Sequence, residues 1–190
     1  MTDKEFTLDT MRRYGRQRAL DVQTESATMT NTELNAQDDF IPDFLAAKEK
    51  MNMLKRHAGM TDGFVCKSSA GRVVRLLQNY DSDVYTGEPE TLTAQWGFVW
   101  SQDPLKAKPF IALSTSPYMT GDCCSVETVD DQGNTVVQVY RSKMDNNVHS
   151  PLDYAAGWEL VEKEAFNYIF VSANTRRRLL CGAFFDWRRI

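Results

Sequence analysis

Histidine is scarce in this chain, with two residues, His57 and His149, among 190. Because imidazole is a common proton carrier and metal ligand near neutral pH, its scarcity removes many of the usual enzyme sites. A nucleophile could be drawn from Cys123 or Cys124 with His149, but the sequence supplies neither an orienting group nor an oxyanion site. We therefore expect a protein that is not an enzyme. The alternative is a thiol enzyme sensitive to alkylation of Cys123 or Cys124.

Long apolar runs are missing as well. No window approaches the ~18 uninterrupted apolar residues of a membrane span, and the start Met-Thr-Asp-Lys-Glu lacks a signal-peptide pattern. The net charge is −4, whereas a domain that binds nucleic acid is normally basic. No glycine-rich run matches a nucleotide-binding pattern. We expect a cytoplasmic protein with no cofactor, no nucleic-acid partner and no membrane insertion.

Cysteine is limited to four residues, Cys66, Cys123, Cys124 and Cys181. Without a secretion signal they are best interpreted as reduced thiols. Their spacing matches no zinc site, and adjacent residues on a strand point to opposite faces. We expect buried thiols that act as small hydrophobic side chains, and no metal.

Residues 1–39 are polar and contain few large apolar groups, which predicts a flexible N-terminal arm. Within it, Leu8, Met11 and Val22 follow a weak amphipathic spacing, and arginines cluster around Tyr14. Two interpretations stay open: a solvated, mobile tail, or a segment that orders against a partner subunit. In the second case the candidate partner-binding residues are Arg12, Arg13, Tyr14, Arg16 and Arg18.

The periodicity predicts one helix over residues 39–58, with Asp39 as its cap and Pro42 in its first turn. Its predicted apolar face consists of Phe44, Ala47, Met51, Leu54 and Ala58. From residue 63 onward the apolar pattern alternates instead. Residues 64–67 and 72–78 are predicted to form a hairpin, and residues 94–100 a further strand. We interpret the aromatic face of that strand as core, because three rings at period two bury much apolar area; it consists of Trp96, Phe98 and Trp100.

The stretch 118–161 has the clearest local pattern. Gly121-Asp122 predicts a corner that leads into a strand, because glycine adopts positive φ and aspartate bonds nearby amides. Residues 135–141 alternate as a strand, and the turn 130–134 holds the residues that tight hairpins select. The segments on either side of the turn are therefore predicted to pair antiparallel.

Five short motifs lie in this stretch: Tyr118 with Gly121-Asp122, Val139-Tyr140-Arg141-Ser142, Asn146-Asn147, Ser150-Pro151, and Trp158-Glu159-Leu160-Val161. Together they resemble the small chitin-binding type of carbohydrate-binding module, over about residues 110–163. Such modules occur in bacterial chitinases and cellulases, and in tail and fibre proteins of tailed bacteriophages. The resemblance implies a small β core built by the Tyr-Arg strand and the closing Trp. It also implies a separate pair of exposed aromatics for sugar stacking, at positions that read Lys143-Met144-Asp145 here.

We therefore expect a mainly β (α+β) fold, with an antiparallel sheet body, one N-terminal helix and a small inserted β module. The expected units are an arm at 1–39, a body at 40–109, the module at 110–163, and C-terminal strands at 164–190 that return to the body.

The resemblance to phage tail and fibre modules, taken with the polar arm and the β-rich body, implies a structural component of a tailed-phage virion, in the tail or baseplate. It would act as a homo-oligomer that contacts other virion subunits and assembles in the host cytoplasm. The alternative is an adhesin that binds a host-surface glycan. Its candidate ligand-binding residues are Tyr118, Tyr140, Tyr154 and Trp158.

Overall fold

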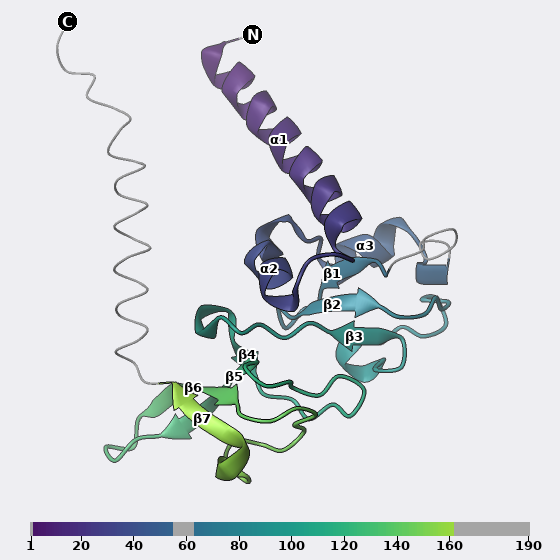
Figure 1. Cartoon of the computed structure of the whole chain (residues 1–190). Coiled ribbons are helices and arrows are strands. Elements are labelled where there is room, and N and C mark those ends of the chain that lie inside the picture. Colours follow the sequence, from purple (N-terminus) through teal and green to yellow (C-terminus); the bar gives the residue numbers. More distant parts are fainter. Residues whose placement is uncertain (1, 55–62, 162–190) are drawn as a thin grey trace, which may run out of the picture.

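The computed structural model describes residues 2–54 and 63–161 and has an α+β fold with two sheets (Figure 1). A three-stranded antiparallel sheet has the order β1-β2-β3, and a four-stranded mixed sheet has the order β4-β5-β6-β7. The strands are β1 Val65–Lys67, β2 Val73–Leu76, β3 Trp96–Phe98, β4 Lys108–Pro109, β5 Cys123–Val129, β6 Thr135–Ser142 and β7 Trp158–Val161. The helices are α1 Asp3–Glu25, α2 Asn31–Ala36 and α3 Phe44–Lys50, with 3-10 turns η1 Asp38–Phe40, η2 Pro89–Thr91, η3 Pro104–Lys106 and η4 Ala155–Gly157. The predicted α+β class is confirmed.

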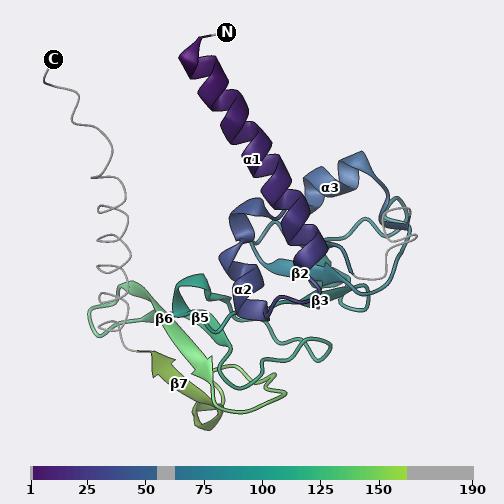
Figure 2. The same cartoon turned by 45° about the horizontal axis from the view of Figure 1, so that its top comes forward.

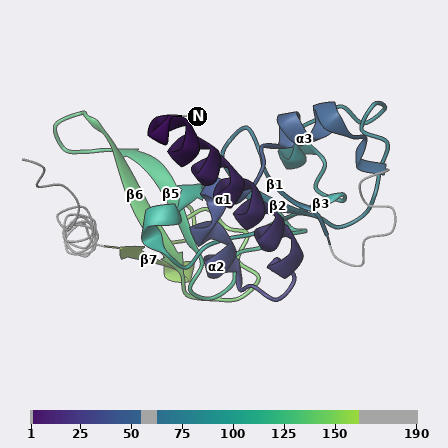
Figure 3. The same cartoon turned by 90° about the horizontal axis from the view of Figure 1, so that it is seen from above.

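Within residues 2–50, three α-helices precede β1, where the sequence predicted one. The lower end of α1 and the whole of α2 lie close to the first sheet (Figure 2), whereas the N-terminal end of α1 points away from both sheets in Figures 1 and 2. Seen from above, the β5–β6 hairpin and α3 are at opposite ends of the molecule (Figure 3). The predicted C-terminal strands at 164–190 lie outside the described residues.

Helix α1 begins in a capping box. The Thr2 hydroxyl accepts a hydrogen bond from the Glu5 amide at 3.3 Å, and the Glu5 carboxylate accepts one from the Thr2 amide at 2.7 Å. Two of the orphan amide groups at the helix start are thereby satisfied, and the acidic first turn suits the positive end of the helix dipole. The prediction of an arm without regular structure over residues 1–39 is therefore wrong for α1.

The end of α1 and the following helix α2 are anchored in the first sheet. Val22 and Leu34 are fully buried, and they pack in a small core with Ile41, Val65, Val73 and Val99. The Asn35 side chain donates to the Val99 carbonyl at 2.9 Å, which ties α2 to the chain after β3. Residues 22–36 thus belong to the folded body, because burial of these side chains offsets the entropy of ordering them.

The predicted helix over residues 39–58 is wrong at its start and is interrupted after Lys50, and residues 55–58 lie outside the described residues. Pro42 disfavours the helical conformation for the residue before it, and Ile41 is extended, with φ −88° and ψ 126°. The Pro42 carbonyl accepts from the Lys67 amide at 2.9 Å, so this segment lies along β1 instead. Helix α3 begins only at Phe44 and ends at Lys50, after which Met51 is extended. The predicted apolar face ends there too: Met51 and Leu54 are exposed, and Met53 is buried in their place.

The first sheet follows the sequence prediction. β1 and β2 form an antiparallel hairpin with Cys66 opposite Val74, and β3 adds to β2 with Trp96 opposite Leu76. The aromatic face of residues 94–100 is buried, as predicted. The exposed fractions are 0% for Trp96, 7% for Phe98 and 4% for Trp100.

The second sheet is built around the β5–β6 hairpin, which is antiparallel as predicted. In its turn, Gly133 has φ +83°, and the Asp130 carboxylate accepts from the amides of Gln132 and Asn134 at 2.9 Å. Gly121 likewise has φ +95° at the corner before β5. β7 pairs with β6 on one side, and β4 pairs in parallel with β5 on the other, so this sheet is mixed.

One aromatic core joins the two sheets. Trp100, which follows β3, stacks on Tyr118 with ring centroids 4.3 Å apart, and Tyr118 meets Trp158 of β7 edge-on at 5.3 Å. Phe98 stacks on Trp100, and Phe110 stacks on Tyr118. Residues 110–161 therefore share their core with the body across the predicted boundary at 109/110.

Candidate functional site

The four aromatics proposed to bind sugar do not form one platform. Tyr118 and Trp158 are 1% and 4% exposed, with their faces covered by the rings of the core. The Tyr118 hydroxyl accepts from the Ile111 amide at 3.4 Å, and the Trp158 indole donates to the His149 carbonyl at 2.9 Å. Burial also raises the pKa of Tyr118 above its usual value. The ligand-binding assignment of Tyr118 and Trp158 is wrong for this structure, because a sugar cannot reach rings that are packed on both sides.

The other two candidates, Tyr140 and Tyr154, differ in how much of the ring is exposed. Tyr140 is half-buried beside the core, and its hydroxyl donates to Gln138 Oε1 at 2.7 Å. Tyr154 is 44% exposed, with its ring centroid 5.3 Å from that of His149. A Cβ at Gly157 would lie 2.8 Å from the Tyr154 ring, so glycine is needed for the ring to rest there. Tyr154 is thus the most exposed of the four rings.

The arginine cluster predicted to bind a partner is on α1. Arg12, Arg13, Tyr14 and Arg16 are exposed, and Tyr14 keeps 68% of its surface open. Arg13 pairs with Asp9 one turn earlier at 2.9 Å, an exposed contact worth a few tenths of a kcal/mol. Arg18 is half-buried and lies 3.6 Å from Glu25. Arg12 and Arg16 make no ion pair with any residue in the described part of the chain.

The apolar side chains of α1 continue the face by which the helix docks. In an α-helix, positions three and four apart share a face, so Val22, Ala19, Gly15, Met11 and Leu8 form one stripe. The stripe is fully buried at Val22, partly buried at Ala19 and Gly15, and 64% and 43% exposed at Met11 and Leu8. The face that packs on the body at one end is therefore open to solvent at the other.

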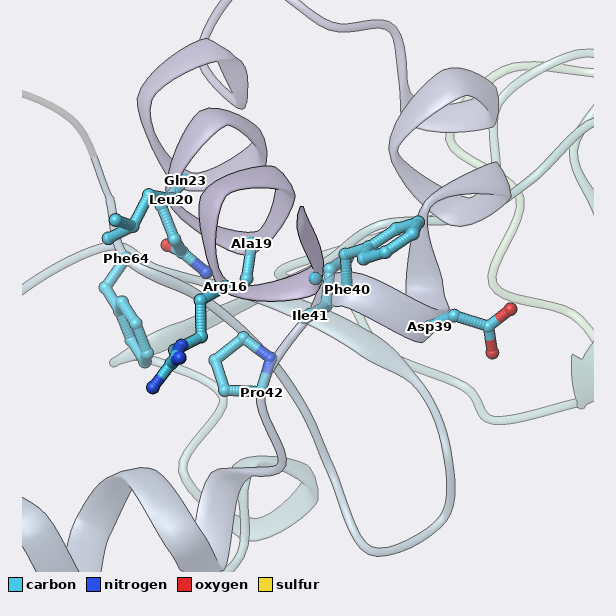
Figure 4. Close-up of a pocket in the computed structure, with 10 residues that line it drawn as sticks. Arg16, Ala19, Leu20, Gln23, Asp39, Phe40, Ile41, Pro42 and Phe64 are labelled. Carbon is cyan, nitrogen blue, oxygen red and sulfur yellow. The ribbon is translucent and has the colours of Figure 1, made fainter. Parts of the chain in front are cut away.

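An apolar groove of about 650 Å³ lies beside this stripe. One wall is the second half of α1, and the other is the extended segment before α3 together with Phe64. Figure 4 shows the Arg16 side chain between Phe64 and Pro42 in this groove. The groove thus combines an apolar lining with a guanidinium at its rim.

Burial and local hydrogen bonds shift the pKa values of the ionisable groups near β5. Asp122 is 3% exposed, and burial raises its pKa, although the Met119 amide donates to its carboxylate at 2.8 Å. Asp145 is exposed, and the hydrogen bond from the Thr120 amide lowers its pKa. Burial raises the pKa of both Cys123 and Cys124, which keeps these thiols protonated near neutral pH. The prediction of buried thiols is confirmed for Cys66, Cys123 and Cys124.

Within residues 2–54 and 63–161, no group of three or more His, Cys, Asp or Glu side chains could hold a metal ion. Over the same residues, no helix has the length and apolar character needed to cross a bilayer. Comparison of the chain with protein-family models, with curated proteins and with solved structures finds no match.

Proposed function

We propose that this protein is a structural component of a tailed-phage virion, in the tail or baseplate, and that it acts through contacts with other subunits. The observation that supports a role in assembly is the position of α1. From Asp3 to Tyr14 its side chains are exposed apart from the half-buried Asp9, and the exposed set includes Phe6, Leu8 and Met11. A helix with so little buried surface gains most of its stability only when its apolar side is covered.

The virion as the setting rests on the resemblance of residues 110–163 to modules found in phage tail and fibre proteins. On this proposal the role of the module is scaffolding. The burial of Trp158 is compatible with that role, because a core side chain supports shape rather than ligand contact.

The test is whether the protein is part of the particle. An antibody against the recombinant protein is used to probe gradient-purified virions of the phage that carries the gene, with a known tail protein as the reference. The proposal predicts that the amount of this protein relative to the reference tail protein is constant across the virion band. It also predicts that the protein is lost from the virion band when Leu8 and Met11 are both changed to Ser. Recovery of the protein only in the soluble fraction of infected cells would contradict it.

A second candidate function is glycan binding at the surface around Tyr154. The exposed ring beside His149 favours it, since a flat apolar face is what a sugar ring stacks on. A glycan array with the wild-type protein and Tyr154→Ala tests it, with Leu152→Ala as the control because Leu152 is 59% exposed on the same loop. Saturable binding that only Tyr154→Ala removes would establish an adhesin. Absence of binding by the wild-type protein excludes this candidate.

A further inference from the structure

We propose that α1 pairs antiparallel with α1 of a second copy of this chain. The inference rests on the proposed assembly function and names its partner. It starts from Leu8 and Met11, which continue the docked face of Val22 and the partly buried Gly15 beyond the body and are open to solvent. Heptad-like spacing of this kind is the pattern by which two helices pack side chains into each other.

The charges of α1 favour a second copy in the antiparallel direction. The first turns carry Asp3, Glu5 and Asp9 against one lysine, and the next turns carry four arginines between residues 12 and 18. A parallel pair would place acid against acid and base against base. An antiparallel pair places the acidic part of each helix against the basic part of the other, which is self-complementary under a two-fold axis.

The apolar stripe fixes the register. With Leu8 of one copy opposite Met11 of the other, these two side chains form both central layers of the contact. Glu5 then lies along the same edge as Arg12 and Arg16 of the second copy, and the symmetric contact repeats this arrangement. Because Arg12 and Arg16 are one turn apart and make no ion pair within the described residues, both guanidinium groups are available to a carboxylate placed between them.

The length of α1 that the body leaves uncovered is consistent with the register that places Leu8 opposite Met11. Thr2 of one copy comes opposite Gln17 of the other, just before the half-buried Arg18 and the buried Val22 where the body begins. A register shifted one heptad toward the body would push the start of one helix into the other subunit. The paired segment therefore coincides with the part of α1 that the body leaves uncovered.

The experiment is sedimentation velocity on the full-length chain across the micromolar range. Two charge-reversed variants are prepared, Arg12→Glu/Arg16→Glu and Glu5→Lys, with Glu5→Gln as a control that retains a capping-box residue. We expect the wild type to associate, and each reversed variant alone to associate about tenfold more weakly, because two like-charge contacts replace two favourable ones. An equimolar mixture of the two variants restores association, because each then meets its opposite charge.

The outcomes separate this inference from the proposed function. A wild-type chain that stays monomeric, or an association that neither reversal weakens, overturns the antiparallel pair while incorporation into virions still stands as the test of function. Helicity by circular dichroism and the thermal unfolding midpoint are measured for every variant. Wild-type values for both show that a loss of association comes from the contact rather than from unfolding of the body.

Discussion

The side-chain amide of Gln23 forms two hydrogen bonds with the backbone of Val65, as a neighbouring strand would. Its Nε2 donates to the Val65 carbonyl at 2.6 Å, and its Oε1 accepts from the Val65 amide at 3.1 Å. Both backbone groups of Val65 that would face a neighbouring strand are thereby satisfied by a side chain of α1, and the Lys67 amide of β1 bonds to the Pro42 carbonyl. The contact with Gln23 anchors α1 and covers an edge that could otherwise pair with another chain.

Replacing Gln23 with Ala is expected to destabilise the protein. It leaves the amide and carbonyl of Val65 without these partners, at a cost of about 1–3 kcal/mol in the free energy of unfolding. Urea denaturation followed by tryptophan fluorescence measures it. The control is Gln17→Ala, since Gln17 is exposed and bonds only to Asp21 on the same helix. Equal effects of the two changes would show that the contact with β1 contributes nothing.

The two module aromatics Trp158 and Tyr154 are expected to differ sharply in their contribution to stability. Trp158→Ala removes a buried ring from the shared core and should cost about 3–5 kcal/mol. Tyr154→Ala removes an exposed ring and should cost about 0.5 kcal/mol or less. Thermal and urea unfolding of both variants check this. A folded, stable Trp158→Ala protein would return Trp158 to the list of ligand candidates.

Two aspartates near the corner before β5 should give opposite pH dependences. Burial raises the folded pKa of Asp122, so its contribution to stability is complete below its unfolded pKa and is lost as pH rises through the raised value. Asp122→Asn should therefore gain stability relative to wild type as pH rises above about 4. Its new side-chain carbonyl can still accept from the Met119 amide, which retains the hydrogen bond seen in the structure.

The matched variant is Asp145→Asn. The hydrogen bond from Thr120 lowers the folded pKa of Asp145, so its stabilising effect is present above the unfolded pKa and is lost as pH falls through the lowered value. Asp145→Asn should be less stable than wild type at neutral pH and approach it at low pH. Unfolding free energies between acid and neutral pH test both variants. Shifts of the same sign for both would contradict the assigned causes.

Two glycines should respond oppositely to alanine. Gly133 has φ +83° in the β5–β6 turn, where a Cβ is strained, so Gly133→Ala should destabilise by about 1 kcal/mol. Gly15 lies inside α1, and a Cβ there meets nothing within 4 Å, so Gly15→Ala should stabilise the helix by up to about 1 kcal/mol. Circular dichroism and thermal unfolding distinguish the two. A loss of helicity in Gly15→Ala would argue against a continuous α1.

Short-range patterns allowed the strands to be predicted. The alternation of residues 94–100 and the turn at 130–134 each depend on neighbours in sequence, and the structure places Trp96 in the core and Gly133 at positive φ as expected. The start of helix α1 is also predictable from neighbours in sequence, because Thr2 and Glu5 match the capping-box pattern. Thr30 and Glu33 match the same pattern at the start of α2. The scarcity of large apolar residues in this segment pointed instead to an arm without regular structure.

The candidate site could not be predicted in the same way. Whether Tyr118 is a platform or a core ring depends on Trp100 lying against it, a contact between segments that are separate in sequence. The helix over 39–58 failed for a similar reason. The carbonyl of Pro42 bonds to the Lys67 amide of β1, a long-range contact that holds the chain before Phe44 along the strand, so that the helix begins only there.

The aromatic series from Phe98 through Tyr118 to Trp158 has a consequence for how such a chain can be recombined. A unit that is exchanged between proteins as a cassette carries its own interior, whereas residues 110–161 borrow part of theirs from the preceding sheet. Excising them would expose Tyr118 to water and leave Trp100 facing a void. The segment therefore depends on the preceding sheet for its core, and grafting it elsewhere requires Phe98 and Trp100 to be transferred with it.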